Sequence, residues 1–452
     1  MDWTKLLCAD RLGSTQRPGA EPQRSPFQRD SDRLVFSSAF RRLQDKTQVF
    51  PLSDNDYVRT RLTHSLEVAS VGRSMGTIVG SAICERGELP GFHPSDFGAV
   101  VSAAALAHDL GNPPFGHSGE DAIRVWFEKS PIAHDARTPL RKVEQEDLAR
   151  FEGNAQGFRL ITRLQMPDNP GLRLTCATLG AFTKYPTEAL VPDRAHTHEG
   201  ASTKKFGFFQ SEREFFTEVA DRCGLIRRAP LHAWWARHPL AFLVEAADDI
   251  CYRLVDFEDG FRLGFLSFDE VQDSFVAVIG DETVRGRAEK MRDPKERIEF
   301  LRALAIGAAV QQTAEQFLEN EAGILDGTFD EPLIDRIACG AALEAIKQRS
   351  VETIYDSPRG VEIEAAGFAV LGGLLDDFVA AVSDVARRGK HASPRSRKLL
   401  RLVPEQSIGP GREPDPNPYQ RLLRMIDFVS GMTDSYAVSL YKKVRGISLP
   451  GQ

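Results

Sequence analysis

The sequence lacks the features that mark a disulfide-stabilised, zinc-knuckle or membrane protein. Its 6 cysteines stand singly, without the paired spacing that a zinc knuckle or a disulfide framework requires. No apolar run approaches the roughly 20 residues of a membrane span, and the charged residues near the N-terminus do not fit a signal peptide. These absences favour a cytoplasmic protein in a reducing compartment, with no membrane partner.

A large excess of charge of one sign is also absent. The chain has 57 basic and 64 acidic residues, which gives a net charge of -7. Such a chain has no general basic field that would attract nucleic acid or an anionic membrane. An anionic substrate would therefore have to be bound by a few local lysines and arginines. Hydrophobic residues make up 42% of the 452 residues, which is enough for a sizeable core.

The alternating apolar and polar residues of β-strands are almost absent, whereas apolar residues at helical spacing recur along the chain. The sequence therefore predicts a mainly α protein without internal repeats. Residues 1–30 are polar and contain several prolines and arginines, so we expect a flexible N-terminal arm there. Regular structure is expected in a main unit over 31–275 and in a C-terminal helical region over 276–452, which includes a helix over 420–441.

An adjacent histidine and aspartate, His108 and Asp109, follow an apolar run over 100–107 that is long enough for a buried helix. Neighbouring side chains on a helix point about 100° apart. Both could therefore reach one ion only near the end of the helix. Gly111 and the two prolines after it place the helix end at this point. The pair is either part of a metal site or a solvated pair at a helix end.

His64 is a second candidate metal ligand. We expect Thr63 to cap a helix in which His64 shares the apolar stripe of Val68, Val71 and Met75. The imidazole should then face the core. A buried histidine is often an ordinary core residue with satisfied hydrogen bonds, but histidine is also the commonest metal ligand.

The segment 241–256 is apolar apart from a few polar residues at helical spacing. Asp248, Tyr252 and Asp256 are four residues apart and would share one face of a helix. Asp249 is expected to form an ion pair with Arg253 on the adjacent face. Asp248 has no basic partner within the helix, so it is either solvated or the carboxylate that binds a cation.

Together, His64, His108, Asp109 and Asp248 would supply two imidazoles and two carboxylates. This ligand set suits a divalent ion such as Mn, Fe, Zn, Co or Ni and leaves coordination positions for water or a substrate oxygen. Mg would favour more carboxylates. The sequence therefore predicts a divalent metal cofactor without identifying the ion.

The arrangement of these four residues is similar to that of the HD-domain metal phosphohydrolases. The flanking words more narrowly resemble the bacterial deoxyguanosine triphosphate triphosphohydrolases (dGTPases). The match runs from residue 27 to about residue 441, and many words occur in the same order. Two departures are Phe36, where many members carry histidine, and Asn112, where the animal dNTP triphosphohydrolases carry histidine. The matching words are FQRD (27–30), SSAFRRLQ (37–44), KTQVF (46–50), RTRLTHSLEV (59–68), HDLGNPPFGH (108–117), FEGNAQG (151–157), KFGFF (205–209), EAADDI (245–250) and SGMTD (430–434).

This resemblance implies a fold and an assembly. Residues 31–275 would form an HD-type helical core with inserted loops. Residues 276–452 would add helices that pack on the core and contribute to oligomerisation. The resemblance implies a homo-oligomer, with a hexamer expected first and a tetramer second.

The resemblance also implies an activity: hydrolysis of dGTP, with other dNTPs as further candidate substrates, to a deoxynucleoside and inorganic triphosphate. Water would attack the α-phosphorus. By resemblance, the four residues named above hold the ion. His117 moves a proton between solvent and the attacking water or the leaving 5′-oxygen, and Glu120 orients its imidazole. Read alone, His117 could equally be a helix-capping residue.

Six further positions match substrate contacts of the family. A tyrosine under the sugar would leave no room for a 2′-hydroxyl and would favour deoxyribose. The phosphates need basic donors because the protein as a whole is acidic. The implied sugar contacts are Gln48, Tyr252 and Asp256, and the implied contacts near the phosphates are Arg61, Asn154 and Lys184.

Two alternatives remain open at this point. One is another HD-type nucleotide phosphohydrolase, such as a 5′-nucleotidase or a cyclic-nucleotide phosphodiesterase. The other is a regulatory protein for which dNTPs or single-stranded DNA are effectors. Lys204 and Lys205 with Phe206, Phe208 and Phe209 have the basic and aromatic mix that binds single strands, although a loop packed in the core explains them as well.

Overall fold

The computed structural model describes residues 1–13, 24–48, 59–87, 89–166, 171–191, 200–355 and 358–448. These ranges are predominantly helical and contain no β-strand. Isolated bridges, such as that between Arg11 and Thr175, are the nearest approach to a sheet. The prediction of a mainly α protein is confirmed.

The α-helices are α1 Trp3–Leu6, α2 Gln28–Val35, α3 Ser38–Arg42, α4 Arg61–Glu85, α5 Pro94–Ala107, α6 Gly116–Lys129, α7 Pro131–Arg137, α8 Lys142–Ala149, α9 Gly153–Arg159, α10 Cys176–Phe182, α12 Arg213–Cys223, α13 Pro239–Arg262, α14 Phe268–Ile279, α15 Thr283–Ala288, α16 Pro294–Glu319, α17 Glu321–Asp326, α18 Gly340–Ser350, α19 Pro358–Arg388, α20 Pro394–Leu402, α21 Glu405–Ile408, α22 Pro418–Ser430 and α23 Asp434–Val444. Short 3-10 or π turns join several of them: η1 Leu43–Asp45, η2 Leu160–Leu164, η3 Ala201–Thr203, η4 Gln210–Glu212, η5 Leu333–Asp335, η6 Val351–Tyr355, η7 Gly389–His391 and η8 Pro410–Arg412.

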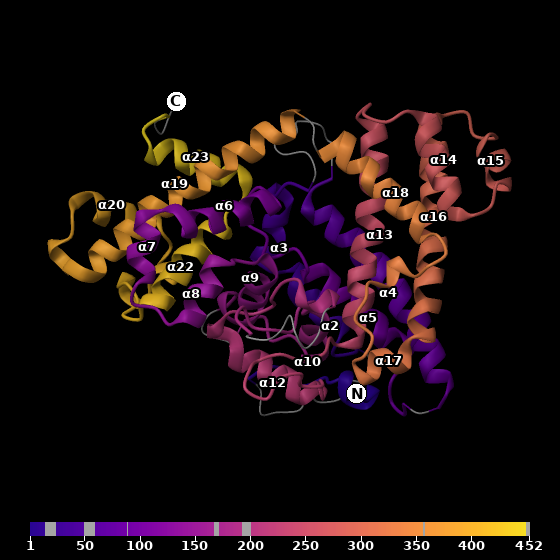
Figure 1. The fold of residues 1–452 in the computed structure, drawn as a ribbon, viewed down its shortest axis with the longest axis horizontal. Coiled ribbons are helices and arrows are strands. Elements are labelled where there is room, and N and C mark those ends of the chain that lie inside the picture. The colour runs from indigo at the N-terminus through magenta and orange to yellow at the C-terminus, as the bar shows by residue number, and fades with distance from the viewer. Residues whose placement is uncertain are drawn as a thin grey trace.

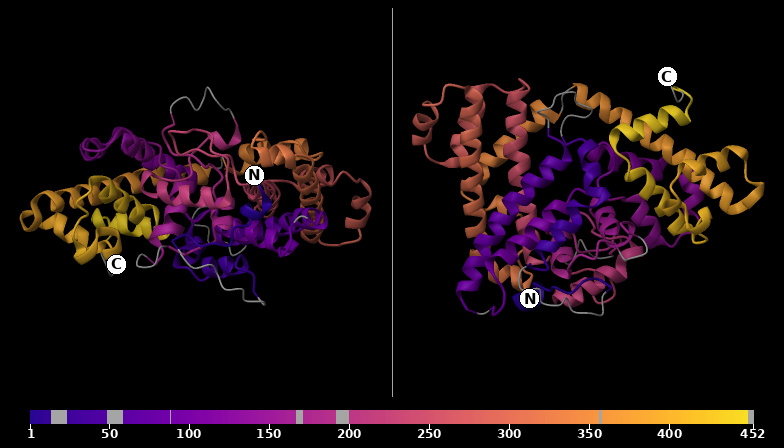
Figure 2. Two further views of the ribbon diagram at one scale, coloured as in Figure 1. Left: turned by 90° about the horizontal axis from the view of Figure 1, so that it is seen from below. Right: turned by 180° about the vertical axis from the view of Figure 1, so that it is seen from behind.

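The buried apolar side chains form two clusters at opposite ends of the molecule. The larger cluster surrounds α4, α5 and α13 and includes α14, α16 and α18. The smaller cluster joins α6, α7 and α8 to α19, α22 and α23. Figures 1 and 2 show these two groups of helices at either end of an elongated molecule. The C-terminal region expected over 276–452 is therefore shared between both clusters, because α16 and α18 pack on α13 whereas α19 packs on α6 and carries α20, α22 and α23.

The helices α4 and α5 lie side by side and carry the first half of the candidate site. Glycines let their backbones approach closely. A Cβ atom at Gly76 would lie only 2.9 Å from the carbonyl oxygen of Phe97. Helix α5 is apolar on most of its surface and is buried along most of its length, as expected of a central core helix. The end of α5 is thereby fixed next to the beginning of α4.

The first residues of the chain are packed in the core. Trp3 is only 7% exposed, and its indole Nε1 donates a hydrogen bond of 2.9 Å to Glu321 on α17. Leu6 and Leu7 are buried as well. The expectation of a flexible arm is therefore wrong for residues 1–13, because three large apolar side chains anchor them. Residues 14–23 of that arm lie outside the described residues.

Two other sequence-based expectations need correction. The helix expected over 420–441 is divided into α22 and α23, and Thr433 caps the second helix by accepting a hydrogen bond from the Tyr436 amide. Helix α4 begins at Arg61 with Thr60 as its N-cap, so Thr63 lies inside the first turn.

Helix α19 corrects the expectation that no segment is long and apolar enough to span a membrane. Residues Gly360–His391 meet that criterion by length and composition. However, 56% of the apolar 18-residue stretch within this segment is buried inside the protein. The buried face includes Leu371, Leu374 and Phe378 of the smaller cluster. The apolar character of α19 is thus explained by its position in a protein core.

We predict that Gly111→Ala destabilises the fold by at least about 3 kcal/mol. A Cβ atom at Gly111 would overlap the Gly153 carbonyl oxygen and the Gly157 amide nitrogen, and backbone atoms cannot turn away as a flexible side chain can. The free energy of unfolding, measured in urea, tests this. Gly307→Ala in α16 is the matched control: a Cβ there meets no atom within 4 Å, so its stability should stay the same or rise. Equal stability of the two variants would contradict the prediction.

Candidate active site

Three helices bring the predicted metal ligands together. His64 lies in the first turn of α4, His108 follows the last residue of α5, and Asp248 lies in the middle of α13. His64 is only 2% exposed, which confirms that its stripe faces the core. The predicted helix end at His108 is also confirmed, since α5 stops at Ala107.

The donor atoms of these residues form a compact cluster. One ligand atom from each of His64, His108 and Asp248 lies within 4.8 Å of the others. The Nε2 atom of His64 is 3.1 Å from Asp248 Oδ1, and the Nε2 atom of His108 is 3.6 Å from the same oxygen. His108 Nδ1 lies 2.6 Å from the Ala105 carbonyl oxygen. Because Nδ1 donates its proton there, His108 Nε2 is left as a free electron-pair donor.

Asp109 lies beside the cluster but is held by two other groups. Its Oδ1 is 3.5 Å from His108 Nε2. Arg61 donates a hydrogen bond of 2.7 Å to Oδ2, and the Asn112 amide donates one of 2.5 Å to Oδ1. The structure thus brings three of the four predicted ligands to within direct reach of one point and places the fourth next to them.

The pKa values of this group reflect the mixture of burial and opposite charges. Burial opposes ionisation of Asp248, but the neighbouring His108 and His64 hold its pKa at about 2. Burial also opposes ionisation of Asp109, and Arg61 and the two histidines hold its pKa below the usual value. Burial would lower the pKa of His64, yet the hydrogen bond and charge of Asp248 raise it overall. The carboxylates are therefore anionic at neutral pH.

The donor set fits a divalent cation. Two imidazole nitrogens and one or two carboxylate oxygens are typical ligands of Mn, Fe, Co, Ni or Zn. The His64 Nδ1 atom is buried and has no hydrogen-bond partner among the described residues, so this ring is held at the cluster through Nε2 alone. A cation held by His64, His108 and Asp248, with Asp109 adjacent, would balance the buried carboxylates.

The ion pair expected between Asp249 and Arg253 does not occur among the described residues. Arg253 instead lies 3.5 Å from Glu344 on α18, a residue remote in sequence. Burial raises the pKa of Asp249 to about 6, although the charge of Lys184 lowers it. The predicted partner of Asp249 is therefore wrong, whereas Asp248 does join the histidine cluster.

His117 and Glu120 form a pair at the beginning of α6. The imidazole is 79% exposed on its side chain, whereas Glu120 is only 2% exposed. His117 Nδ1 lies 3.0 Å from Glu120 Oε2, and the Gly153 amide donates a hydrogen bond of 2.6 Å to Oε1. Burial opposes ionisation of Glu120, but His117 and Lys205 lower its pKa overall. The glutamate thus fixes the ring with Nε2 directed away from the pair.

A second buried carboxylate, Glu152, lies behind this pair and organises polar groups at the same wall. It accepts hydrogen bonds from Lys205 at 2.9 Å, Asn154 at 2.8 Å and Arg124 at 3.1 Å. Burial and the negative charge of Glu120 raise the pKa of Glu152. Lys205 Nζ is also 3.8 Å from Glu120, so one lysine bridges both carboxylates.

These groups surround one cavity of about 210 Å³. Three of the predicted metal-site residues line it: His108, Asp109 and Asp248. The His117–Glu120 pair and two of the six predicted substrate contacts, Asn154 and Lys184, line it as well. Lys184 Nζ is 3.2 Å from Glu245, which also pairs with Arg237 at 2.6 Å. The residues that line the cavity are His108, Asp109, Asn112, His117, Glu120, Asn154, Ala181, Phe182, Lys184, Tyr185, Lys205, Ala241, Val244, Glu245 and Asp248.

The other four predicted substrate contacts do not line this cavity. Arg61 is bonded to Asp109, and Gln48 has a buried side-chain oxygen without a hydrogen-bond partner. Asp256 accepts a hydrogen bond of 2.8 Å from Tyr355 of η6. The ring of Tyr355 stacks on Tyr252 with a centroid distance of 5.5 Å. Tyr252 and Asp256 thus form a group with Tyr355, one and two turns beyond Asp248.

Sequence reasoning did not assign Tyr185 or Lys205 to the site. Lys184 Nζ lies 5.7 Å above the Tyr185 ring, and both residues follow the end of α10 at the cavity. The sequence left Lys205 either in a strand-binding surface with three phenylalanines or in a loop packed in the core. The sequence does contain a clue. Lys205 is the only charged residue of the motif KFGFF (205–209), which is one of the motifs that resemble the dGTPases.

The phenylalanines beside Lys205 are core residues. Phe206 and Phe209 belong to the smaller cluster, and Phe208 stacks on Phe216 in the larger one, at a centroid distance of 4.7 Å. Their rings are buried and cannot stack on the bases of a single strand. The interpretation of this segment as a loop packed in the core is confirmed.

Comparison with known proteins agrees with the geometry. The HD domain family model matches residues 61–154, which include His64, His108 and Asp109 as well as His117 and Glu120. A deoxyguanosinetriphosphate triphosphohydrolase-like protein of Synechocystis sp. is 47% identical over 99% of this chain and 100% of its own length. A protein of the same description from Pseudomonas aeruginosa is 40% identical over the whole of both chains. The deoxyguanosinetriphosphate triphosphohydrolase of Salmonella paratyphi A is 32% identical over 93% of this chain and 94% of its own.

The helical fold and the paired His108–Asp109 at the end of α5 thus define an HD-domain protein. Asp248 lies outside the region that the HD model matches, on a helix that the full-length relatives also cover. Because the similarity extends over nearly the whole of each chain, the protein belongs to the bacterial dGTPase family of the HD superfamily.

Proposed function

We propose that the protein hydrolyses dGTP, and other dNTPs with it, to the deoxynucleoside and inorganic triphosphate, in a reaction that depends on a divalent metal ion. The observation that supports this most strongly is the shared cavity. Three of the candidate metal-site residues (His108, Asp109 and Asp248), the His117–Glu120 pair and the cations Lys184 and Lys205 line one volume of about 210 Å³. The names of the full-length relatives point to the same substrate class.

His64, His108 and Asp248, with Asp109 adjacent, would hold the ion. A bound divalent ion supplies Lewis acidity at a phosphate oxygen and lowers the pKa of water. Arg61 and Asn112 hold the Asp109 carboxylate in a fixed orientation beside this point. The ligands therefore need little rearrangement to act together.

His117 would carry the proton. Its Nδ1 is hydrogen-bonded to Glu120, so Nε2 can accept a proton from the attacking water or donate one to the leaving 5′-oxygen. Glu120 is buried and anionic, and it stabilises the imidazolium that forms when Nε2 takes up a proton. The high exposure of the ring lets His117 exchange this proton with solvent.

Lys184 and Lys205 would bind the phosphate chain. Each lies at the cavity, and each is held in place by a buried carboxylate, Glu245 or Glu152. Triphosphate carries several negative charges, which such charge-assisted hydrogen bonds stabilise. We also propose that Asn154, Arg61 and Tyr185 contribute to this end of the site.

The group of Tyr252, Asp256 and Tyr355 supports recognition of the deoxyribose. The stacked rings and the hydrogen bond to Asp256 form a rigid face beyond the metal ligands on α13. A rigid face beside the sugar would exclude a 2′-hydroxyl sterically, Tyr252 and Asp256 would bind the 3′-hydroxyl, and Gln48 would also contact the sugar. A panel of four dNTPs and GTP tests this preference, and equal rates with dGTP and GTP would refute it.

The products decide the reaction. Incubation with dGTP and Mn²⁺ should yield tripolyphosphate, detected by phosphorus NMR after the Mn²⁺ is removed, and an equal amount of deoxyguanosine, measured by chromatography. A chelator should abolish the reaction, and added Mn²⁺ should restore it. Release of orthophosphate alone would identify a nucleotidase instead and would overturn the proposal.

We predict that Lys205→Met raises KM for dGTP about 10- to 100-fold, since a charge-assisted hydrogen bond contributes about 1.5–3 kcal/mol. Steady-state kinetics measure the change, and the thermal unfolding midpoint controls for folding, because Lys205 also neutralises Glu120 and Glu152. Lys204→Met is the matched control, since Lys204 is exposed and does not line the cavity. An unchanged KM in Lys205→Met would show that Lys205 does not contribute to binding of dGTP.

We further propose a cytoplasmic homo-oligomer, a hexamer before a tetramer. Large apolar side chains are exposed on the first half of α19, where Val361 and Phe368 are 50% and 40% exposed. Exposed apolar side chains on one helix face are typical of subunit interfaces. Light scattering gives the mass directly, and a monomer at micromolar concentration would contradict the proposal. A DNA titration tests whether single strands act as effectors.

A further inference from the structure

A buried arginine, Arg237, lies directly behind one wall of the candidate active-site cavity. It is only 2% exposed and does not line the cavity itself. Its guanidinium nevertheless contacts three residues that do line it, Lys184, Tyr185 and Glu245. Arg237 can therefore act on the site only through these neighbours.

The main chain places Arg237 beside Lys184. The segment that follows α10 runs antiparallel to the segment that leads into α13, with a bridge between Thr187 and Trp234. Arg237 extends this pairing with its side chain, because its Nε donates a hydrogen bond of 2.8 Å to the Lys184 carbonyl oxygen. The guanidinium thus fixes the backbone at Lys184.

The same guanidinium holds the carboxylate of Glu245 on α13. Its Nη1 donates a hydrogen bond of 2.6 Å to Oε2, and its Nη2 donates one of 3.4 Å to Oε1. The Lys184 Nζ atom lies 3.2 Å from Oε1. Burial opposes ionisation of Glu245, but Arg237 and Lys184 hold its pKa at about 2. One buried carboxylate is therefore shared by two cations.

This sharing affects how Lys184 can be used. A buried carboxylate with a single cationic partner holds that partner in a close ion pair, because the cost of burying its charge is otherwise uncompensated. Arg237 supplies a second positive charge, so Lys184 does not have to neutralise Glu245 alone. The Lys184 side chain is 28% exposed, whereas that of Arg237 is 1% exposed. The lysine is thus the cation of the two that an anion in the cavity can reach.

Arg237 also fixes the ring of Tyr185. The guanidinium carbon lies 5.8 Å from the centroid of this ring and 5.1 Å from that of Phe242. The Lys184 Nζ atom lies 5.7 Å from the Tyr185 centroid as well. Cations at such distances over an aromatic face are attracted to the ring. One guanidinium therefore holds the backbone of Lys184, the carboxylate that binds its ammonium group and the neighbouring ring.

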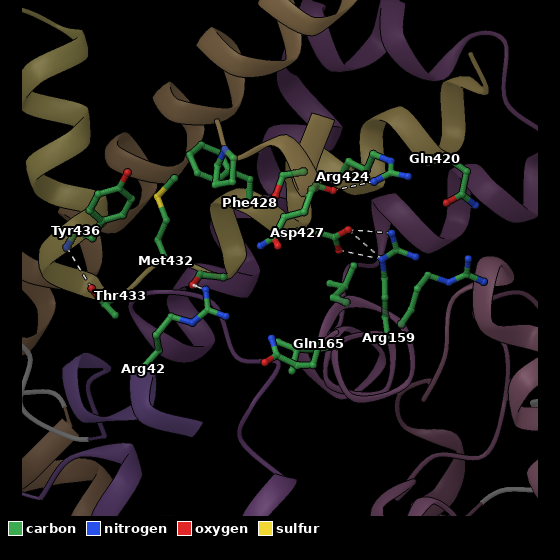
Figure 3. A pocket seen from close by; sticks show the side chains of 17 residues that line it. Arg42, Arg159, Gln165, Gln420, Arg424, Asp427, Phe428, Met432, Thr433 and Tyr436 are labelled. Carbon is green, nitrogen blue, oxygen red and sulfur yellow. Dashed lines mark hydrogen bonds and ion pairs between the residues drawn. The ribbon is translucent and has the colours of Figure 1, made fainter. Parts of the chain in front are cut away.

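Arg159 is a buried arginine with similar contacts but without this connection. It is also 2% exposed, and it pairs with Asp427 at 2.8 Å and with Glu212 at 2.7 Å. Arg159 and Asp427 line a separate cavity (Figure 3). Neither of its two carboxylate partners lines the candidate active-site cavity. Comparison of the two arginines therefore separates the effect of a buried ion pair from an effect on the site.

We propose that Arg237 is a positioning residue for the triphosphate: it fixes Lys184 and Tyr185 at the cavity and leaves the Lys184 ammonium group able to bind phosphate. The inference rests on the proposed function, in which Lys184 binds the phosphate chain. His117 lies on another helix, α6, and is held there by Glu120. Loss of Arg237 should therefore raise KM for dGTP and leave kcat nearly unchanged, as expected when only binding is weakened.

The test measures binding of inorganic tripolyphosphate to the full-length protein by calorimetry, in the presence of a chelator, so that it does not depend on turnover. Arg237→Met should weaken this binding about 10- to 100-fold, since a charge-assisted contact to phosphate is impaired. In a Lys184→Met background, Arg237→Met should weaken binding further by about twofold or less, because its effect passes through Lys184. A merely structural role would give the same loss in both backgrounds.

Arg159→Met is the matched control. It should lower the thermal unfolding midpoint as Arg237→Met does, because each leaves buried carboxylates without a partner. Its affinity for tripolyphosphate should stay within about twofold of the wild-type value. Arg237→Lys is the second variant should Arg237→Met fail to fold. It keeps the positive charge, but one ammonium group cannot replace the bidentate guanidinium, so it should weaken binding at least about threefold.

The outcomes separate this role from the proposed function. Wild-type protein that binds tripolyphosphate and releases it from dGTP, combined with unchanged affinity in Arg237→Met and Arg237→Lys, would overturn the role of Arg237 alone. Equal losses in both backgrounds, or an equal loss in Arg159→Met, would also overturn it. Wild-type protein that neither binds tripolyphosphate nor releases it from dGTP would overturn the proposed function and this inference together.

Discussion

His117→Ala is expected to lower kcat for dGTP by about 10²- to 10⁴-fold while the metal content stays unchanged. The imidazole touches none of the candidate ligands and is held by Glu120 alone among the described carboxylates. Its side chain is largely exposed, so the fold should not suffer. Steady-state kinetics with metal analysis of the same samples measure both quantities.

Two further variants sharpen this result. His134→Ala on α7 removes an exposed histidine outside the cavity and should leave kcat unchanged. Glu120→Gln keeps a hydrogen-bond acceptor for Nδ1 but removes the charge that stabilises the imidazolium, so its loss should be smaller than that of His117→Ala. Turnover of His117→Ala within about twofold of the wild-type rate would show that this histidine carries no proton in the reaction.

Asp248→Ala is expected to remove the metal ion. The loss in metal affinity should exceed about 100-fold, because even groups that only orient a ligand change affinity about 10- to 100-fold. The Asp248 oxygen is the atom that lies close to both His64 and His108. Metal analysis after dialysis, together with a titration of Mn²⁺ into the chelated protein, measures this loss.

Asp249→Ala is the matched control for that experiment. It removes the adjacent carboxylate of the same helix, which lies toward Lys184 and outside the cluster. The variant should keep its metal. Full metal content in Asp248→Ala combined with loss in Asp249→Ala would show that the other face of α13 holds the ion.

The cluster of candidate metal ligands could be predicted largely from local patterns. His64 was placed correctly because its apolar stripe on α4 faces the core, and His108 because a glycine and prolines end α5. Both signals lie within a few residues of the ligand. The helical spacing of apolar residues shows which side chains share a face. On a helix in the core, that apolar face must point into the protein interior.

Contacts between remote segments could not be predicted in this way. Arg253 pairs with Glu344 and not with Asp249, although the i, i+4 spacing favoured Asp249. Trp3 is ordered by Glu321, more than 300 residues away in sequence. Lys205 comes to the active site because Glu152 binds it there. In each case the partner residue lies on a different element, and the spacing of residues within one helix does not predict a contact with another element.

The burial of Phe206 and Phe209 illustrates the same limit from the opposite side. A basic and aromatic segment has the composition of a surface that binds single-stranded nucleic acid. Only the structure shows that both rings are packed in the smaller cluster and are not available at the surface. The lysine of the same segment faces the cavity instead. Composition fixes which chemistry a segment can perform, whereas its neighbours decide which side chains are free to perform it.

The most direct measurement is a crystal of the protein grown with Mn²⁺ and recorded at the manganese absorption edge. A single strong anomalous peak should lie between the Nε2 atoms of His64 and His108 and the carboxylate of Asp248, with Asp109 beside it. A map without a peak at that point, or with manganese bound only by other side chains, would contradict the convergence of these helices on one cation.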